Sequence, residues 1–159
     1  MYLKSLLSIL LLSICSILSA QTLKPWTWDY YNMTFQAPDN MVVKENNANK
    51  FEASNISIAM DIYPRIGENL TYDGMKNAII NWAYQTSLYY NSDNQPIYLA
   101  NINRYWGCAI DGTHQGFPAS ILLLVDPDSP NISFYIWISY KTEYYHDAVA
   151  ILKSFRPKQ

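Results

Sequence analysis

Two apolar segments joined by a five-residue loop constrain the fold of this chain more than any other feature. Residues 121–125 read Ile-Leu-Leu-Leu-Val, a continuous apolar run typical of a central strand that is covered on both faces. Residues 132–140 alternate instead, so that Ile136 shares one face with other apolar residues while Tyr135 and Trp137 lie on the other. The loop between them is rich in proline and aspartate. Together they predict an antiparallel hairpin.

Further strands are expected on both sides of a central helical region. The segment 56–63 alternates with period two, which places Ile56, Ile58, Met60 and Ile62 on one face and Asp61 and Tyr63 on the other. Pro64 is expected to end this strand. The other predicted strands are residues 32–37, 41–45, 51–54, 97–102 and 105–113.

Two helices are predicted from apolar residues that recur every three or four positions. Thr71 is suited to cap the first helix, and the turn formers at 91–94 are expected to close it. The second helix is expected over 142–155, with Pro157 as its stop. The predicted inward stripes are Met75, Ala78, Ile79, Trp82, Ala83, Thr86 and Tyr89 for the first helix, and Tyr145, Ala148, Ile151, Leu152 and Phe155 for the second.

Strands that come in runs and pair locally indicate the α+β class. We therefore expect a single domain over residues 21–159, built from an antiparallel β-sheet with the helices packed on one face. A chain of this length is sufficient for one hydrophobic core.

The first twenty residues have the order of a secretory signal peptide. Lys4 supplies the positive start, residues 6–18 are almost wholly apolar, and Ser19-Ala20 offers small residues before a cut. A membrane anchor is disfavoured because the apolar run is shorter than the roughly 18–20 residues that span a bilayer. A lipoprotein signal is disfavoured because Ile14, which precedes Cys15, is not small. We expect cleavage after Ala20, a bacterial secreted or periplasmic protein, and no membrane span in the remainder.

Charge argues against two classes of partner. Without Lys4, ten Lys and Arg face thirteen Asp and Glu, which leaves a net charge of −3. The basic residues are scattered and form no stripe. Nucleic acid and anionic lipid both require clustered positive charge, so neither is expected as a partner.

The end of the chain resembles the PsbP-like fold group. The resemblance lies in FYIWISY and AVAILKSFRP following LLLVDPDSPN, and it extends over most of residues 30–157. Its most specific part is the last strand and helix, which close in Ser154-Phe155. This group includes the extrinsic P subunit of photosystem II, a Ran-release factor and exported bacterial domains. The group shares no catalytic motif, so the resemblance implies a non-enzymatic binding or accessory module without a cofactor.

A cysteine-centred catalytic site is weakly supported. Cys108 is the one cysteine after residue 20, and it alternates onto an apolar face with Trp106 and Ile110. Burial there would make the thiol inert. His114 and His146 are expected at the surface. A small extracytoplasmic hydrolase, using Cys108 or an acidic pair, remains the alternative function.

Metal and acidic motifs are equally sparse. The sequence contains no HxH, HxxxH or CxxC, and residues 126–129 lack the glycine and the distant glutamate of a calcium loop. Asp61, Asp73 and Asp111 are isolated. No metal site, catalytic residue or cofactor is therefore predicted.

Aromatic residues are the one unusual feature. Tyr135 and Trp137 lie on the face opposite Ile136, and Tyr63 lies opposite Ile62 on its own strand. Exposed Tyr and Trp supply rigid contact area at low entropic cost. We predict that these three residues bind a protein or glycan partner in the cell envelope. The alternative is that the aromatic segment around Trp26 packs over this face and covers it.

Overall fold

The computed structural model describes residues 21–158 apart from residues 92 and 94–96, and for residues 97–100 it describes the backbone alone. The predicted signal peptide, residues 1–20, lies outside the described residues. The α+β class is confirmed: two antiparallel sheets are combined with two α-helices. No helix in the described part of the chain is long and apolar enough to cross a membrane.

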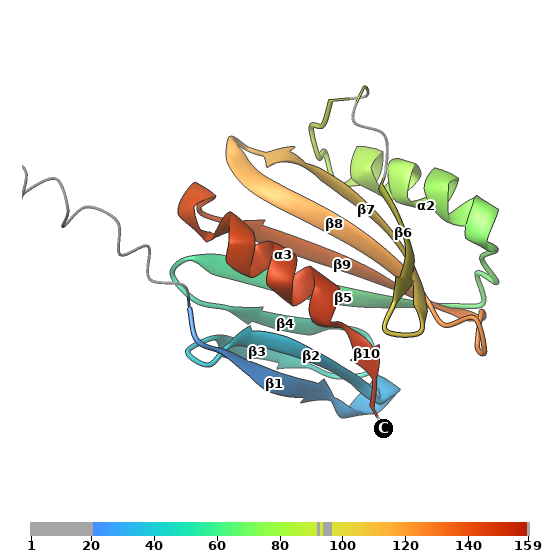
Figure 1. Ribbon diagram of the computed structural model, residues 1–159, viewed down its shortest axis with the longest axis horizontal. Helices are drawn as coiled ribbons and strands as arrows, with labels where there is room; N and C mark the ends of the chain where they lie inside the picture. The colour runs from blue at the N-terminus through green and yellow to red at the C-terminus, as the bar shows by residue number, and fades with distance from the viewer. Residues whose placement is uncertain (1–20, 92, 94–96, 159) are drawn as a thin grey trace, which may run out of the picture.

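The larger sheet has seven strands in the order β3-β4-β5-β9-β8-β7-β6, and a smaller sheet has the order β1-β2-β10 (Figure 1). Each strand predicted from residue 32 onward is present with shifts at its ends, but the expectation that Pro64 ends its strand is wrong, because β5 stays paired with β9 through Pro64 to Ile66. The two strands that sequence analysis missed, β1 and β10, both belong to the smaller sheet. The bounds are β1 Leu23–Trp28, β2 Met33–Pro38, β3 Val42–Asn46, β4 Phe51–Ser54, β5 Ile58–Ile66, α2 Tyr72–Gln85, β6 Ile97–Ile102, β7 Tyr105–His114, β8 Phe117–Val125, β9 Ile132–Tyr140, α3 Tyr145–Ser154 and β10 Arg156–Pro157.

The predicted hairpin is formed by β8 and β9, which pair in register from Ala119 opposite Ser139 to Val125 opposite Ser133. Because side chains alternate along a strand, the continuous apolar run of β8 faces two separate cores. Leu122 and Leu124 contribute to one core, and Ile121 and Leu123 contribute to the other. The expectation of a central strand covered on both faces is confirmed.

The two helices lie on opposite faces of the larger sheet, which differs from the expected packing on one face. α2 packs Met75, Ile79 and Trp82 against the core that contains Ile121, and α3 packs Ile151 against the core that contains Leu122. Figure 1 shows α3 in front of the larger sheet and α2 behind β6. The two-sided apolar character of β8 is the physical reason, because one helical layer leaves half of its side chains exposed.

The smaller sheet shares one face of the larger sheet with α3. Phe35 of β2 stacks on Phe155 with ring centroids 5.0 Å apart and meets Phe51 of β4 edge-on at 5.4 Å. Trp28 at the end of β1 is fully buried, and its indole Nε1 donates a hydrogen bond to the backbone oxygen of Asn47 at 3.1 Å. The aromatic segment at the N-terminus therefore forms part of this core.

Helix α2 ends earlier than its predicted stripe. At its N-terminal end, the cap Thr71 accepts a hydrogen bond from the backbone nitrogen of Gly74 as expected. At its C-terminal end, the hydroxyl of Thr86 donates a hydrogen bond to the backbone oxygen of Trp82 at 2.8 Å. Ser87 then adopts a left-handed φ of 55°, which stops the helix. The prediction that Tyr89 points inward is wrong, since its side chain is 80% exposed.

Two further residues expected in the core are exposed. Ile56 precedes the start of β5 and is 86% exposed, because the chain pairs with its neighbours from Ile58 onward. Tyr145 is 43% exposed, because residues 142–144 form a short 3₁₀ turn that changes the register at which α3 begins. The remainder of the α3 stripe is buried as predicted.

The chain that follows α2 is fastened to β7 by a two-bond bridge. The backbone groups of Tyr89 and Thr113 exchange hydrogen bonds of 2.8 Å in both directions. Gly112 lies directly beneath this bridge, where an added methyl group would collide with the carbonyl oxygen of Tyr89.

We therefore expect Gly112→Ala to displace the bridge and to lower the free energy of unfolding by about 1–3 kcal/mol. Urea denaturation followed by tryptophan fluorescence measures this change. Asp111→Ala, an exposed neighbour on the same strand, serves as the control and should change stability by less than about 0.5 kcal/mol. Equal effects of the two substitutions would contradict the steric argument.

Candidate functional site

A groove opens on the α2 face of the larger sheet, beyond the C-terminal end of α2. Its volume is about 570 Å³ and it is open to solvent. Strands β5, β7 and β9 supply its floor, while α2 and the loop before β4 supply its walls. The residues that line it are Asn49, Asp61, Tyr63, Pro64, Arg65, Trp82, Thr86, His114 and Trp137.

The floor is an aromatic cluster built around Trp82. This side chain is 5% exposed, and its ring lies edge-on to Tyr135 at 5.0 Å and to both Tyr63 and Trp137 at 6.5 Å. His114 meets Trp137 edge-on at 5.2 Å. Edge-to-face contacts of this kind fix the orientation of each ring. The half-buried faces of Tyr63 and Trp137 are therefore held in place at the groove surface.

Tyr135 lies below this floor and supports it. It is 1% exposed, its hydroxyl donates to the Glu68 carboxylate at 3.0 Å, and the guanidinium of Arg65 lies 4.2 Å above its ring centre. Burial, reinforced by the negative charge of Glu68, raises the pKa of Tyr135. The phenol therefore stays protonated and acts as a hydrogen-bond donor.

The polar wall of the groove contains a half-buried ion-pair network. Lys50 Nζ lies 2.6 Å from Glu52 Oε2 and 3.0 Å from Asp61 Oδ1. Asp61 Oδ1 is buried and, within the described part of the chain, makes no well-directed hydrogen bond. The same ammonium group lies 5.2 Å above the ring of Tyr63, which links the network to the aromatic floor.

The surroundings act differently on the pKa values of Asp61 and Lys50. Burial raises the pKa of Asp61, because the loss of water outweighs the attraction of Lys50. Burial also acts to lower the pKa of Lys50, but its contacts with Glu52 and Asp61 outweigh burial and raise it. Lys50 has two carboxylates to support its charge, whereas Asp61 shares one cation with Glu52. Asp61 is therefore the member whose charge is least stabilised.

The three residues predicted to bind a partner lie together, but in different layers. Tyr63 and Trp137 line the groove, whereas Tyr135 is buried beneath it and is not available for contact. Their binding role stays a prediction. Sequence reasoning missed Trp82, Arg65 and Asn49. Alternation along β5 would have indicated Arg65, since it shares a face with Tyr63, but nothing local places Asn49 beside them.

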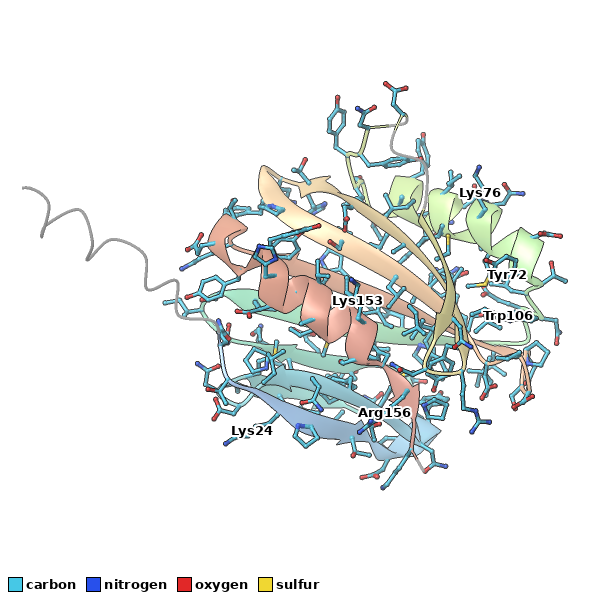
Figure 2. All side chains as sticks on the ribbon, in the orientation of Figure 1. Lys24, Tyr72, Lys76, Trp106, Lys153 and Arg156 are labelled. Carbon is cyan, nitrogen blue, oxygen red and sulfur yellow. The ribbon has the colours of Figure 1, made fainter. Side chains whose placement is uncertain are left out.

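The N-terminal aromatic segment does not cover this face. Trp26 packs edge-on against Phe51 at 6.2 Å, within the core on the α3 side of the larger sheet. The other end of the α2 face is closed by Tyr72 and Trp106, whose rings meet edge-on at 5.9 Å (Figure 2). The groove is therefore the part of this face that neither α2 nor its aromatic neighbours cover.

The structure separates the three residues considered for cysteine catalysis. Cys108 is fully buried under α2, and burial raises the pKa of its thiol to about 11. His114 lies about 20 Å further along the same strand at the usual rise per residue. His146 is exposed on α3, which packs on the opposite face.

Acidic and metal-binding groups are also dispersed. Asp61 is the one carboxylate among the described residues that line the groove, and Asp73 and Asp111 are exposed elsewhere. Asp128, considered for a calcium loop, forms an exposed ion pair with Arg104 at 3.1 Å. Residues 21–158, outside the gaps given above, contain no group of three or more metal-ligating side chains.

Comparison with known proteins identifies the fold but no family. No protein-family model matches the chain, and no curated protein matches it in sequence. The crystal structure of the Ran-binding protein Mog1p of Saccharomyces cerevisiae superposes with a TM-score of 0.58 at 6% identity, covering 88% of this chain and 97% of Mog1p. A crystal structure from Bacteroides thetaiotaomicron gives a TM-score of 0.49 at 11% identity, covering 87% of this chain and 49% of that one. The likeness to Mog1p shows the fold, which agrees with the PsbP-like resemblance at that level.

Burial of Cys108 leads to a direct test of thiol reactivity. A rise of the pKa from 9.0 to about 11 lowers the thiolate fraction about 100-fold near neutral pH. We expect an aromatic disulfide reagent to modify the folded protein at least that much more slowly than the urea-unfolded chain. Stoichiometric labelling of the folded protein at the unfolded rate would instead show an accessible, reactive cysteine.

Substitution of Asp61 leads to a test of the groove's electrostatics. Its pKa in the folded state is raised, so its contribution to stability is present at low pH and is lost as pH rises through that value. Asp61→Asn removes this dependence. We expect the free energy of unfolding of the variant minus that of the parent to be more positive at about pH 7 than at about pH 3, because the charged Asp61 destabilises only the parent at the higher pH. The opposite sign in urea titrations at the two pH values would show that Lys50 dominates.

Proposed function

We propose that the protein is an exported, non-catalytic binding module of PsbP-like type that holds a protein partner of the cell envelope in the groove beyond α2. The observation that carries this proposal is the aromatic floor of the groove. Tyr63 and Trp137 present half-exposed rings, and both meet the buried Trp82 edge-on. Rigid aromatic surfaces of this kind dominate the binding energy of protein interfaces.

Pre-organisation supports a binding role for these rings. Ordering a flexible side chain on binding costs about 0.5–1.5 kcal/mol, and rings already fixed by packing avoid most of that cost. A groove of about 570 Å³ also has room for one large anchoring side chain of a partner and its neighbours. The floor therefore favours a partner that inserts an apolar anchor.

Charges around the floor support specificity. Lys50 and Asp61 lie on one side, and Arg65 lies nearby, so both signs of charge are presented at close range. Charged groups around an apolar centre orient a partner and disfavour wrong ones more than they add affinity. A partner with charged residues flanking its anchor fits this arrangement.

A protein is favoured over a glycan as the partner. The fold is that of Mog1p, which is a Ran-binding protein, so the same arrangement of strands and helices can present a protein-binding surface. The identity of the two chains is too low to transfer the partner itself. Export is supported by the signal-like residues 1–20, and a partner in the cell envelope is the corresponding proposal. Binding of a glycan is a possible outcome of the test below.

No observation favours the hydrolase alternative to the same degree. Its two proposed centres were Cys108 and a pair of carboxylates. Cys108 is buried with a raised pKa. Asp61 and its cross-strand neighbour Glu52 are both engaged by Lys50, and Glu52 is not among the described residues that line the groove. An acid pair that cleaves glycosidic bonds needs two carboxyl groups on one cleft.

The proposal predicts which substitutions abolish binding. Envelope and culture extracts are passed over immobilised residues 21–159, and any captured protein is then purified and titrated. We expect Trp137→Ala with Tyr63→Ala to weaken its affinity by about 30-fold or more, the usual effect of losing a central aromatic anchor. The control is Tyr84→Ala with Tyr89→Ala, which removes two tyrosines that are 87% and 80% exposed outside the groove. The control should bind like the parent.

A second variant separates binding from folding. Asn49→Trp adds bulk at an exposed wall of the groove without removing a core contact, and it should also block the partner. Tyr135 is unsuitable for this purpose because its truncation opens the core. Equal binding by the parent, both groove variants and the control would place the site elsewhere. Capture of an oligosaccharide on a glycan array, lost by the same groove variants, would keep the groove and change the partner class.

A further inference from the structure

Asp147 is a carboxylate in a place where an unpaired charge is costly. It lies in the first turn of α3, it is 9% exposed, and its Oδ2 accepts a hydrogen bond from the backbone nitrogen of Gln21 at 3.1 Å. A buried carboxylate is stabilised by a positive partner, and a neutral peptide N–H compensates it only in part. The position at a helix N-terminus supplies some of the remainder.

Gln21 is held in this position from several sides. Its side-chain Oε1 accepts a hydrogen bond from Asn55 Nδ2 at 2.8 Å, and Asn55 also donates to Asn40 Oδ1 at 2.7 Å. The oxygen of the next residue, Thr22, accepts from the backbone of Asp39 at 3.2 Å, immediately before β1 begins. The nitrogen that contacts Asp147 is therefore held by contacts of its own side chain and of the residue that follows it.

The same nitrogen is the atom that the predicted cleavage after Ala20 would release. We propose that Gln21 is the first residue of the mature protein and that its α-ammonium group forms an ion pair with the buried carboxylate of Asp147. Water adds across the Ala20–Gln21 peptide bond, so that Ala20 leaves with a carboxylate and Gln21 keeps an amine, which takes up a proton. The contact between a neutral peptide N–H and the carboxylate then becomes an ion pair between two charged groups.

The proposal has an energetic consequence. The positive charge on the released amine adds Coulomb attraction to a hydrogen bond whose acceptor is already charged. Cleavage would therefore strengthen the link between the start of β1 and α3, two segments from opposite ends of the chain. A carboxylate that served only as a partner of the helix dipole would not respond to the charge on Gln21.

It also has a chemical consequence that is specific to glutamine. A free N-terminal glutamine cyclises when its amine attacks its own side-chain carbonyl carbon, which forms pyroglutamate and releases ammonia. The attack requires the unprotonated amine. An ion pair with Asp147 keeps the amine protonated, and the contact with Asn55 keeps the side-chain carbonyl away from it. The folded protein should therefore keep an uncyclised glutamine.

This inference rests on the export part of the proposed function and is independent of the partner. Asp147 belongs to α3, on the face of the larger sheet opposite to the groove. Loss of partner binding in groove variants leaves the ion pair untouched, and loss of the ion pair leaves the groove residues in place. The two proposals can therefore fail separately.

The first experiment uses the full chain, expressed in a bacterial host and recovered outside the cytoplasm. Intact mass spectrometry is expected to give the mass of residues 21–159 with an uncyclised N-terminus. A different N-terminus, a chain that is not processed, or a mass smaller by one ammonia would overturn the proposal.

The second experiment measures coupling in the processed protein. The α-amine of Gln21 is either left free or acetylated, and both forms are prepared for the parent and for Asp147→Asn. The equilibrium constant for unfolding is then measured in urea for all four proteins. Acetylation is expected to raise that constant about tenfold in the parent, since it removes the positive member of the ion pair, and by less than about twofold in Asp147→Asn. Glu143→Gln, which removes an exposed carboxylate just before α3, should behave like the parent.

Cyclisation supplies a readout that a purely structural role would not change. A tenfold coupling between the two charges lowers the unprotonated fraction of the amine about tenfold. We therefore expect Asp147→Asn to form pyroglutamate about tenfold faster than the parent and Glu143→Gln to match the parent. Equal cyclisation rates in all three proteins, or equal effects of acetylation in them, would overturn the ion pair even if cleavage occurs after Ala20.

Discussion

The fold depends on one constraint, which is that strand β8 is apolar on both faces. Leu122 and Leu124 require cover on one side, and Ile121, Leu123 and Val125 require it on the other. Each such side chain gains about 1.5–3 kcal/mol on full burial, so neither side can be left open. A single helical layer cannot meet both demands. The chain meets them with α2 on one face and with α3 beside the smaller sheet on the other.

The groove follows from unequal cover on the two faces. On the α3 side, the smaller sheet extends the cover across β4 and β5, where Phe35 and Trp28 reach Phe51. On the α2 side, a single helix stops at Gln85 and leaves β5 and part of β9 without a second layer. The hydroxyl of Thr86, the left-handed turn at Ser87 and the close approach at Gly112 together set where that cover ends.

Much of this architecture was predictable from the sequence because alternation reports directly on burial. The limits of β9 and β6 agree with the predicted segments, and α2 begins at its predicted cap. Strand β1 was missed because Pro25 and several aromatic residues obscure its pattern, and such a proline is tolerated there because β1 lies at the edge of its sheet. The groove was only partly predictable. Tyr63 and Trp137 share a face by alternation, whereas Trp82 and Asn49 join them through tertiary packing that no local pattern encodes.

The position of the groove nevertheless follows from a change in side-chain polarity across the larger sheet, from apolar on β8 to charged on β5. On the α2 face, β8 presents Ile121 and Leu123, whereas β5 presents Asp61 and Arg65. Strand β9 lies between them, and there the same face carries Tyr135 and Trp137, which combine large apolar surfaces with a polar group. Amphipathic rings suit the boundary between a dry core and solvent. The aromatic floor therefore lies where the cover of α2 ends, and Asp61 and Arg65 beside it belong to β5, the strand at the edge of that cover.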